Sequence, residues 1–270
     1  MGLWSAYCSL PTAYSTLHHV QRNQPPGVPP LALTGERTLP DVPIENYWFR
    51  RHLAVYEWIA RRCRGLRVVD LACGEGYGSD VLARTAASVV GLDANPEAHE
   101  HARLRYRRDN LRFERGLVEE FAGPCDAIVF LQTIEHVADA GALLERIASA
   151  APLAYVSTPN RLTLAPPGAE RSDNPWHVRE YTLDEYRTLL EPRFADVAIL
   201  GLFHARKLRA HELALGLGWD RVHRALRITD AFYGRFVPAI SSSDFAFRDT
   251  GLANALDFLA VCSNPATADA

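Results

Sequence analysis

Two histidines and a glutamate stand where they could carry out acid–base chemistry. Glu135 and His136 lie in the short polar segment 132–136 that follows the apolar run 126–131, and His177 lies in a long polar loop that follows a later apolar run. An imidazole changes its charge near neutral pH, so it can take a proton from a hydroxyl group. His136 is therefore the candidate base, with Glu135 orienting it, and His177 is the second candidate. The structural alternatives are that Glu135 is merely a charge at a helix N-terminus, and that His177 belongs to a lid whose polar groups only hydrogen-bond to one another.

A glycine-rich turn follows another apolar run, and residues 68–78 read Val-Val-Asp-Leu-Ala-Cys-Gly-Glu-Gly-Tyr-Gly. A strand, a turn of this kind and a helix form a nucleotide-binding unit. Asp93 ends the next apolar run, where a carboxylate suits the two hydroxyls of a ribose. The dinucleotide fingerprint asks for glycine at position 79, and Ser79 stands there, which disfavours a nicotinamide cofactor.

These groups need a scaffold that brings them together, and the chain supplies one in alternating apolar runs and helical patterns. This alternation predicts an α/β fold with a mainly parallel, doubly wound sheet. Ligands of such sheets lie beyond the carboxyl ends of the strands, so the polar groups there should converge on one edge: residues 74–78, 93, 132–136 and 158–160. After the sixth strand we expect a helix over 207–228, an irregular aromatic stretch over 231–250 and a last strand over 255–262.

Composition bounds the remaining possibilities. The chain has 270 residues, 48% of them hydrophobic, and a net charge of -3, which gives no electrostatic case for a nucleic-acid partner. Its five cysteines form no C-x-x-C pair, and no apolar run approaches ~20 residues, so we expect a cytoplasmic protein without a membrane partner. We expect a loosely attached tail at 1–30, a single domain at 31–264 with a helical insert at about 204–250, and a disordered tail at 265–270.

The turn resembles motif I of the class I S-adenosylmethionine-dependent methyltransferases, D/E-x-G-x-G-x-G, with Ala72 at the first glycine. Further segments are similar to bacterial glycan O-methyltransferases, above all to the actinobacterial sugar 1-O-methyltransferases of methylmannose polysaccharide synthesis: residues 34–37, 45–52, 134–136, 157–161, 174–180 and 201–204.

The resemblance implies a Rossmann-like, seven-stranded sheet whose last strand is antiparallel, with the helical insert before it. It implies methyl transfer to the 1-hydroxyl of a short 3-O-methylated mannoside. The residues expected at S-adenosylmethionine are Asp70, Ala72, Gly74, Gly76, Asp93, Ala94, Leu117, Gln132 and His52. The family also implies Mg²⁺, for which Glu135 and His136 are the expected ligands; the related ubiquinone-type enzymes carry Glu-x-x-Glu-His, and Gln132 replaces the first glutamate here.

Other functions stay open at this point. The alternatives are a quinone, a phenol or another small natural product as the acceptor, and a non-catalytic cofactor-binding subunit. Amino methylation of nucleic acid is disfavoured, because residues 157–160 read Ser-Thr-Pro-Asn rather than Asn/Asp-Pro-Pro-Tyr/Phe. The partners we expect are a small saccharide and a second copy of the chain in a homodimer.

Overall fold

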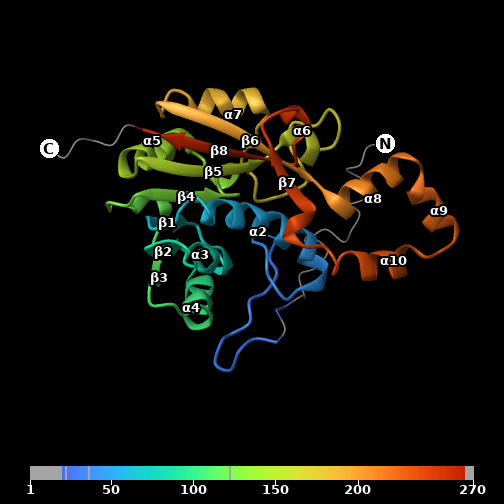
Figure 1. The fold of residues 1–270 in the computed structure, drawn as a ribbon, viewed down its shortest axis with the longest axis horizontal. Coiled ribbons are helices and arrows are strands. Elements are labelled where there is room, and N and C mark those ends of the chain that lie inside the picture. The colour runs from blue at the N-terminus through green and yellow to red at the C-terminus, as the bar shows by residue number, and fades with distance from the viewer. Residues whose placement is uncertain (1–19, 22, 36, 122, 265–270) are drawn as a thin grey trace. The chain divides into compact units, whose positions relative to one another are not determined.

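An eight-stranded sheet forms the centre of the fold, with strand order β3-β2-β1-β4-β5-β8-β6-β7 (Figure 1). The computed structural model describes residues 20–264 except 22, 36 and 122. Strands β1 to β5 pair in parallel, and β8 lies antiparallel between β5 and β6. This confirms the predicted α/β sheet with an antiparallel last strand, one strand larger than expected. The strands are β1 Arg67–Leu71, β2 Ser88–Asp93, β3 Leu111–Arg115, β4 Ala127–Leu131, β5 Leu153–Pro159, β6 Asp196–His204, β7 Phe245–Arg248 and β8 Asp257–Ser263.

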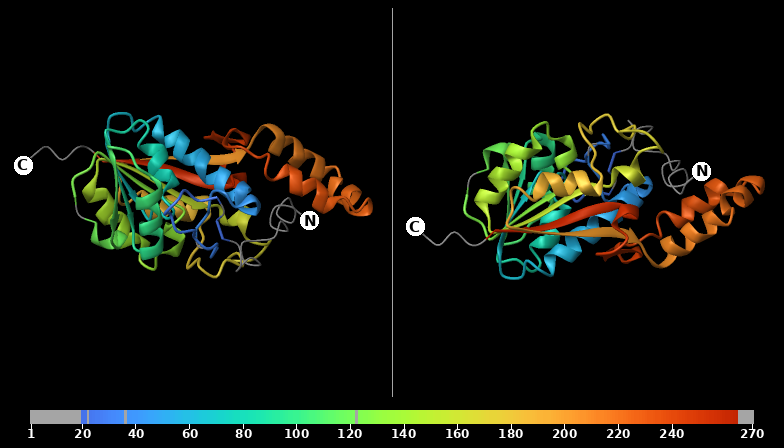
Figure 2. Two further views of the ribbon diagram at one scale, coloured as in Figure 1. Left: turned by 90° about the horizontal axis from the view of Figure 1, so that it is seen from below. Right: turned by 90° about the horizontal axis from the view of Figure 1, so that it is seen from above.

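Helices lie on both faces of this sheet, as Figure 2 shows. Helix α7 begins with a capping box of Thr182 and Glu185, and α5 buries Leu143, Leu144 and Ile147. The α-helices are α2 Asn46–Ala60, α3 Tyr77–Leu82, α4 Pro96–Arg105, α5 Ala140–Ala150, α6 Arg161–Leu164, α7 Leu183–Leu190, α8 Arg206–Gly216, α9 Trp219–Ala225 and α10 Thr229–Phe236. The 3₁₀ turns are η2 Pro43–Glu45, η3 Val118–Glu120, η4 Ile134–His136, η5 Ser242–Asp244 and η6 Leu252–Asn254.

The chain divides into two compact units. One joins the residues up to Ala54 to Phe203–Ala246, and the other joins Val55–Leu202 to the residues from Phe247 onward. The core of the second unit is centred on β4, whose five residues are all buried. The first unit holds the predicted insert, together with a small apolar cluster of Leu31, Leu33, Leu39 and Val42. The predicted domain limits of 31–264 stay a prediction.

Three local predictions are wrong. The helix expected over 207–228 is two helices, because Gly218 adopts a left-handed φ of 92° between α8 and α9. The stretch 231–250 is expected to be irregular, but it forms most of α10 and the extra strand β7. Its aromatic residues recur at helix or strand spacing and pack against other rings, as Phe232 does on Phe236. The sequence also predicts that Asp41 caps the next helix, with Pro43 in its first turn, but η2 starts after Val42 and no side chain there accepts a capping hydrogen bond.

Two further expectations concern chain ends and membranes. Most of the tail predicted at 1–30, and all of that at 265–270, lies outside the described residues. Four cysteines within the described part are free and buried. No helix of this part is long and apolar enough to cross a bilayer.

Packing explains two of the motif glycines. A Cβ atom on Gly78 would lie 2.1 Å from the ring of Tyr56, and one on Gly76 would lie 2.8 Å from the side chain of Ala102. Gly76 also has a left-handed φ of 96°. These two glycines therefore let α2, α3 and α4 approach the turn closely, rather than leaving open backbone for a ligand at each glycine, as the motif alone suggests.

Replacing Gly78 by Ala should destabilise the protein by roughly 1–3 kcal/mol, because the Tyr56 ring is held in place by its hydroxyl and cannot move aside. Urea unfolding followed by circular dichroism measures the change. Gly216→Ala is the matched control, since a Cβ there meets no atom within 4 Å. Equal stability of the two variants would contradict this account of Gly78.

Candidate functional site

The glycine-rich turn is tied to the end of β2 by Asp93. The two oxygens of this carboxylate accept backbone hydrogen bonds, Oδ2 from Gly74 at 2.8 Å and Oδ1 from Asn95 at 2.8 Å. Ala72 and Gly74 both have left-handed φ values, of 57° and 56°. Each carboxylate oxygen keeps a second lone pair, so Asp93 can position the turn and still accept hydrogen bonds from ribose hydroxyls.

Asp70 lies beneath the turn with no exposed surface. Its carboxylate accepts hydrogen bonds from Ser79 Oγ at 2.7 Å and Tyr56 Oη at 3.1 Å. Burial raises the pKa of Asp70 to about 7, although these two hydrogen bonds oppose the rise. The side chain thus joins β1, α2 and α3, which gives it a positioning role; a direct contact with a cofactor stays a prediction.

Ala94 and Leu117 follow β2 and β3 at the same edge of the sheet. Ala94 is exposed, and its carbonyl accepts a hydrogen bond from Arg115 Nε at 3.4 Å. The side chain of Leu117 is 50% exposed. An apolar side chain open to solvent at this edge suits the face of a planar base.

The other two predicted cofactor residues have different surroundings. Gln132 follows β4 with a left-handed φ of 49°, and its Nε2 donates to Ser157 Oγ at 3.1 Å. This uncommon backbone conformation turns the chain from β4 into η4. His52 belongs to the other compact unit, where its Nδ1 lies 3.4 Å from Thr38 Oγ1. Its contact with a cofactor stays a prediction.

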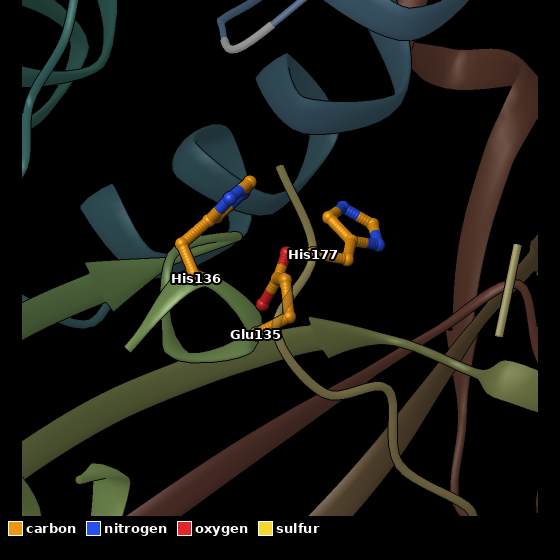
Figure 3. Close-up of side chains that lie close together, drawn as sticks. All are labelled: Glu135, His136 and His177. Atoms are coloured by element: carbon orange, nitrogen blue, oxygen red, sulfur yellow. The ribbon is translucent and has the colours of Figure 1, made fainter. Parts of the chain in front are cut away.

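Glu135, His136 and His177 come together in one cluster (Figure 3). One ligand atom from each lies within 4.8 Å of the others, and the two imidazole rings are 4.9 Å apart at 80°. The first two residues belong to η4, directly after β4, and His177 comes from the loop after α6. That loop is held in place because the Glu135 carbonyl accepts hydrogen bonds from the amides of Val178 and Arg179, at 2.8 and 3.1 Å.

The ring of His136 is oriented by a backbone carbonyl. Its Nδ1 lies 2.9 Å from the carbonyl oxygen of Trp176. A carbonyl only accepts, so Nδ1 carries the hydrogen, and in the neutral ring Nε2 carries the lone pair. This is the arrangement that a base needs.

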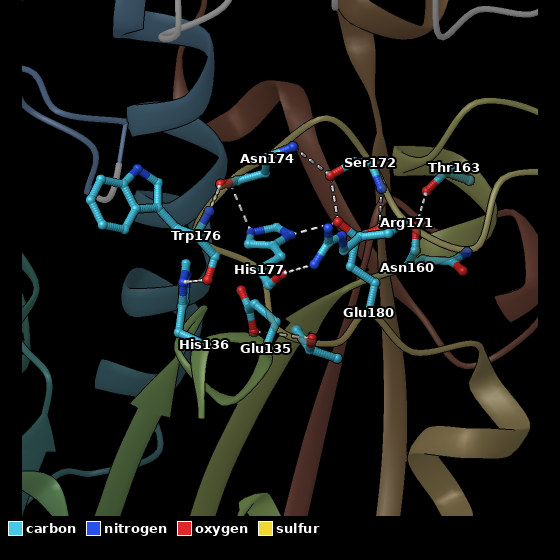
Figure 4. Close-up of polar contacts among 11 residues, drawn as sticks. Glu135, His136, Asn160, Thr163, Arg171, Ser172, Asn174, Trp176, His177 and Glu180 are labelled. Atoms are coloured by element: carbon cyan, nitrogen blue, oxygen red, sulfur yellow. Dashed lines mark hydrogen bonds and ion pairs between the residues drawn. The ribbon is translucent and has the colours of Figure 1, made fainter. Parts of the chain in front are cut away.

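His177 has a partner on each ring nitrogen, as Figure 4 shows. Its Nδ1 donates to Glu180 at 2.6 Å, and its Nε2 lies 2.9 Å from the amide nitrogen of Asn174. Burial alone would raise the pKa of Glu180, but hydrogen bonds from His177 and Ser172 hold it below its ordinary value. His177 and Glu180 therefore form a tightly paired dyad.

Comparison with known proteins connects this geometry to a family. A family model described as "Methyltransferase domain" matches residues 45–209. A probable S-adenosylmethionine-dependent methyltransferase of Mycobacterium tuberculosis is 37% identical over 250 residues, which cover 87% of this chain and 90% of that protein. The chain belongs to the S-adenosylmethionine-dependent methyltransferases.

Two other similarities are more limited. A ubiquinone biosynthesis O-methyltransferase of Erwinia tasmaniensis is 37% identical over 92 residues, 31% of this chain and 38% of that protein. A solved methyltransferase of Thermotoga maritima, a possible histamine N-methyltransferase, aligns with a TM-score of 0.55 and 15% identity, covering 81% of this chain and 93% of that chain. This last similarity concerns the fold alone.

Sequence reasoning missed two polar networks of this methyltransferase. It named Asn174 and Glu180 as members of the loop but gave neither a role at His177. It also gave no role to Glu75, which is buried and contacts His101, Arg105 and Tyr106, at 3.0, 3.1 and 2.7 Å. The spacing of four residues between His101 and Arg105 on a helix was the available signal, because it places both side chains on one face.

Glu135 is the buried acid of the candidate site, with 1% of its surface exposed. Burial raises its pKa to about 8, although hydrogen bonds, including one from Thr158 Oγ1 at 3.1 Å, oppose the rise. A raised carboxyl pKa means that the folded state favours the protonated acid. Stability linked to Glu135 is therefore fully present below the ordinary pKa of 4.5 and is lost as the pH rises toward 8.

Replacing Glu135 by Gln, which stays neutral at every pH, should remove this loss. In chelator-treated protein, we expect the free energy of unfolding of the variant, relative to that of the wild type, to rise by about 1–4 kcal/mol between pH 5 and pH 8. Denaturant unfolding across this range measures the difference, with the exposed Glu119→Gln as control. A difference that does not change with pH would contradict the raised pKa.

Proposed function

We propose that this methyltransferase transfers the methyl group of S-adenosylmethionine to a hydroxyl of a saccharide, and that the preferred acceptor is the 1-hydroxyl of a short 3-O-methylated mannoside. The observation that carries the O-methyl part is the orientation of His136, whose Nδ1–H faces the Trp176 carbonyl. The similarity of residues 45–52 and 201–204 to sugar 1-O-methyltransferases supports the acceptor.

The cofactor would lie over the turn and against Asp93. When bound, S-adenosylmethionine supplies a methyl group on a positively charged sulfur, so the donor needs no further activation. Asp93 would accept hydrogen bonds from the ribose, and the exposed Leu117 would contact the adenine. The full proposed set is Asp70, Ala72, Gly74, Gly76, Asp93, Ala94, Leu117, Gln132 and His52.

His136 would remove the proton of the acceptor hydroxyl during an in-line displacement. Nε2 takes the proton, and the Trp176 carbonyl then stabilises the imidazolium through the Nδ1–H hydrogen bond. Glu135, with its pKa near 8, is mainly protonated at neutral pH, so it adds little charge beside the ring. The remaining task of the chain is to align the acceptor, which is worth a large part of the rate in such displacements.

The same three residues also fit a divalent cation, which the family implies as Mg²⁺. Their donor atoms lie within 4.8 Å of one another, and the Nδ1–H of His136 has a hydrogen-bond acceptor, as in metal-binding histidines. His177 would become a ligand once Asn174 Nδ2 releases its Nε2. Two imidazoles with one carboxylate favour Mn²⁺ over Mg²⁺. A cation there would supply Lewis-acid stabilisation of the acceptor oxygen. Because a coordinated nitrogen cannot accept a proton, His136 acts as a base only when it is not a ligand.

The second candidate function is methylation of a quinone or phenol, which the partial match to a ubiquinone biosynthesis O-methyltransferase favours. A purified-protein assay with labelled S-adenosylmethionine separates the candidates. We expect label in a 3-O-methylmannoside and little in the unmethylated mannoside or a catechol, with any stimulation by Mn²⁺ appearing at lower concentration than that by Mg²⁺. Transfer only to the catechol would support the second candidate, and no transfer to any acceptor would favour a non-catalytic subunit.

Replacing His136 by Ala should lower kcat by roughly 10²–10⁴ while leaving S-adenosylmethionine affinity unchanged, because the base acts only on the acceptor. Asp93→Ala should show the reverse, with weak cofactor binding in calorimetry. His99→Ala, on α4, is the control for a general loss of histidine. An unchanged kcat in the His136 variant would remove the base assignment, and normal affinity in the Asp93 variant would reject the ribose contact.

A further inference from the structure

Aliphatic side chains are concentrated on the outside of α8 and α9. Leu217 is 90% exposed, Leu226 63% and Leu213 56%, and Val222 and Ile228 are exposed as well. The other large exposed hydrophobic residues of the described chain are scattered: Val20, Leu117, Leu162, Trp176 and Val178. Single exposed hydrophobic residues are ordinary, but several in one short segment indicate a binding surface.

These aliphatic residues are not needed for the packing of the helices that carry them. α8, α9 and α10, which follow one another in Figure 1, pack through aromatic and histidine rings on their inner side. His211 lies 4.6 Å from Phe236, and Phe232 lies 5.7 Å from Trp219 and stacks on His223. The segment thus has an apolar interior of its own, and its exposed aliphatic residues, which we call the outer face, are Leu213, Leu217, Val222, Leu226 and Ile228.

The same segment is basic although the chain is acidic. Residues 206–235 contain seven Lys and Arg against three Asp and Glu, a net charge of +4 in a chain of net charge -3. Within the described residues, no ion pair or hydrogen bond engages the side chains of Arg221, Arg227 or Arg235. The segment therefore combines exposed aliphatic groups with three arginines that pair with no acid among the described residues.

We propose that the outer face of α8 and α9 binds the surface of an anionic phospholipid bilayer. Leucines beside uncompensated arginines on short helices are typical of segments that lie in the headgroup region, where aliphatic groups enter the acyl boundary and arginines contact phosphates. Leu217, at the turn between the helices, would enter first. No described helix could span the bilayer, so the contact is peripheral. It departs from the expectation, drawn from composition, of a chain without a membrane partner.

Co-sedimentation of the full chain with vesicles tests the proposal, comparing pure phosphatidylcholine with vesicles that contain about one third phosphatidylglycerol. We expect binding to the anionic vesicles that weakens in high salt and is at least about tenfold weaker in each of two double variants, L217Q/L226Q and R221Q/R227Q. These side chains are exposed, so the variants should fold as the wild type does, which circular dichroism checks.

L162Q and R64Q, which change exposed residues outside the segment, are the matched controls and should bind as the wild type does. No binding to anionic vesicles, or equal binding by all variants, would overturn the proposal. So would a concentration-dependent dimer in sedimentation velocity that L217Q/L226Q abolishes without any vesicle binding by the wild type, since the face would then join two copies of the chain.

Discussion

The two backbone hydrogen bonds that the Glu135 carbonyl accepts from Val178 and Arg179 hold the candidate catalytic cluster together. They place His177 and the Trp176 carbonyl beside His136, whose Nδ1 lies 2.9 Å from that carbonyl. The loop also closes on its own start, because Asn160 and Tyr181 form a parallel bridge and Arg161 donates its amide to Tyr181. Backbone hydrogen bonds thereby attach this segment, which has no regular structure, both to η4 and to its own start.

The sheet and its functional edge could be predicted because apolar runs and strand ends are local properties of the sequence. Parallel strands bring their carboxyl ends to one edge, so Asp93 and Glu135 could be assigned to that edge before any contact was known. The pairing of His177 with Glu180 lies within one loop, yet it depends on the loop's path, which no periodicity encodes. The strand β7 was missed for a similar reason, since four residues are too few to show an alternating pattern.

Buried acids connect the stability of this fold with its chemistry. Asp70 and Glu135 both lie in the interior, and burial raises their pKa values to about 7 and about 8. Hydroxyl groups donate hydrogen bonds to both buried acids. Ser79 and Tyr56 donate to Asp70, and Thr158 donates to Glu135. Burying an apolar residue in either place would cost less free energy than burying an acid, and the two acids weaken the fold as the pH rises. What they contribute instead is a positioned turn and a polar site.

Asn174 decides which imidazole can act as the base. Its Oδ1 accepts a hydrogen bond from the Trp176 amide at 2.9 Å, so its Nδ2 must be the atom that faces His177 Nε2. That nitrogen donates, and it therefore occupies the lone pair that His177 would need to receive a proton. A rotated amide would lose both hydrogen bonds and would place two acceptors against each other. His177 is consequently oriented within the loop with both ring nitrogens engaged, whereas the ring of His136 is oriented through Nδ1 by a carbonyl of the same loop, as its proposed role as the base requires.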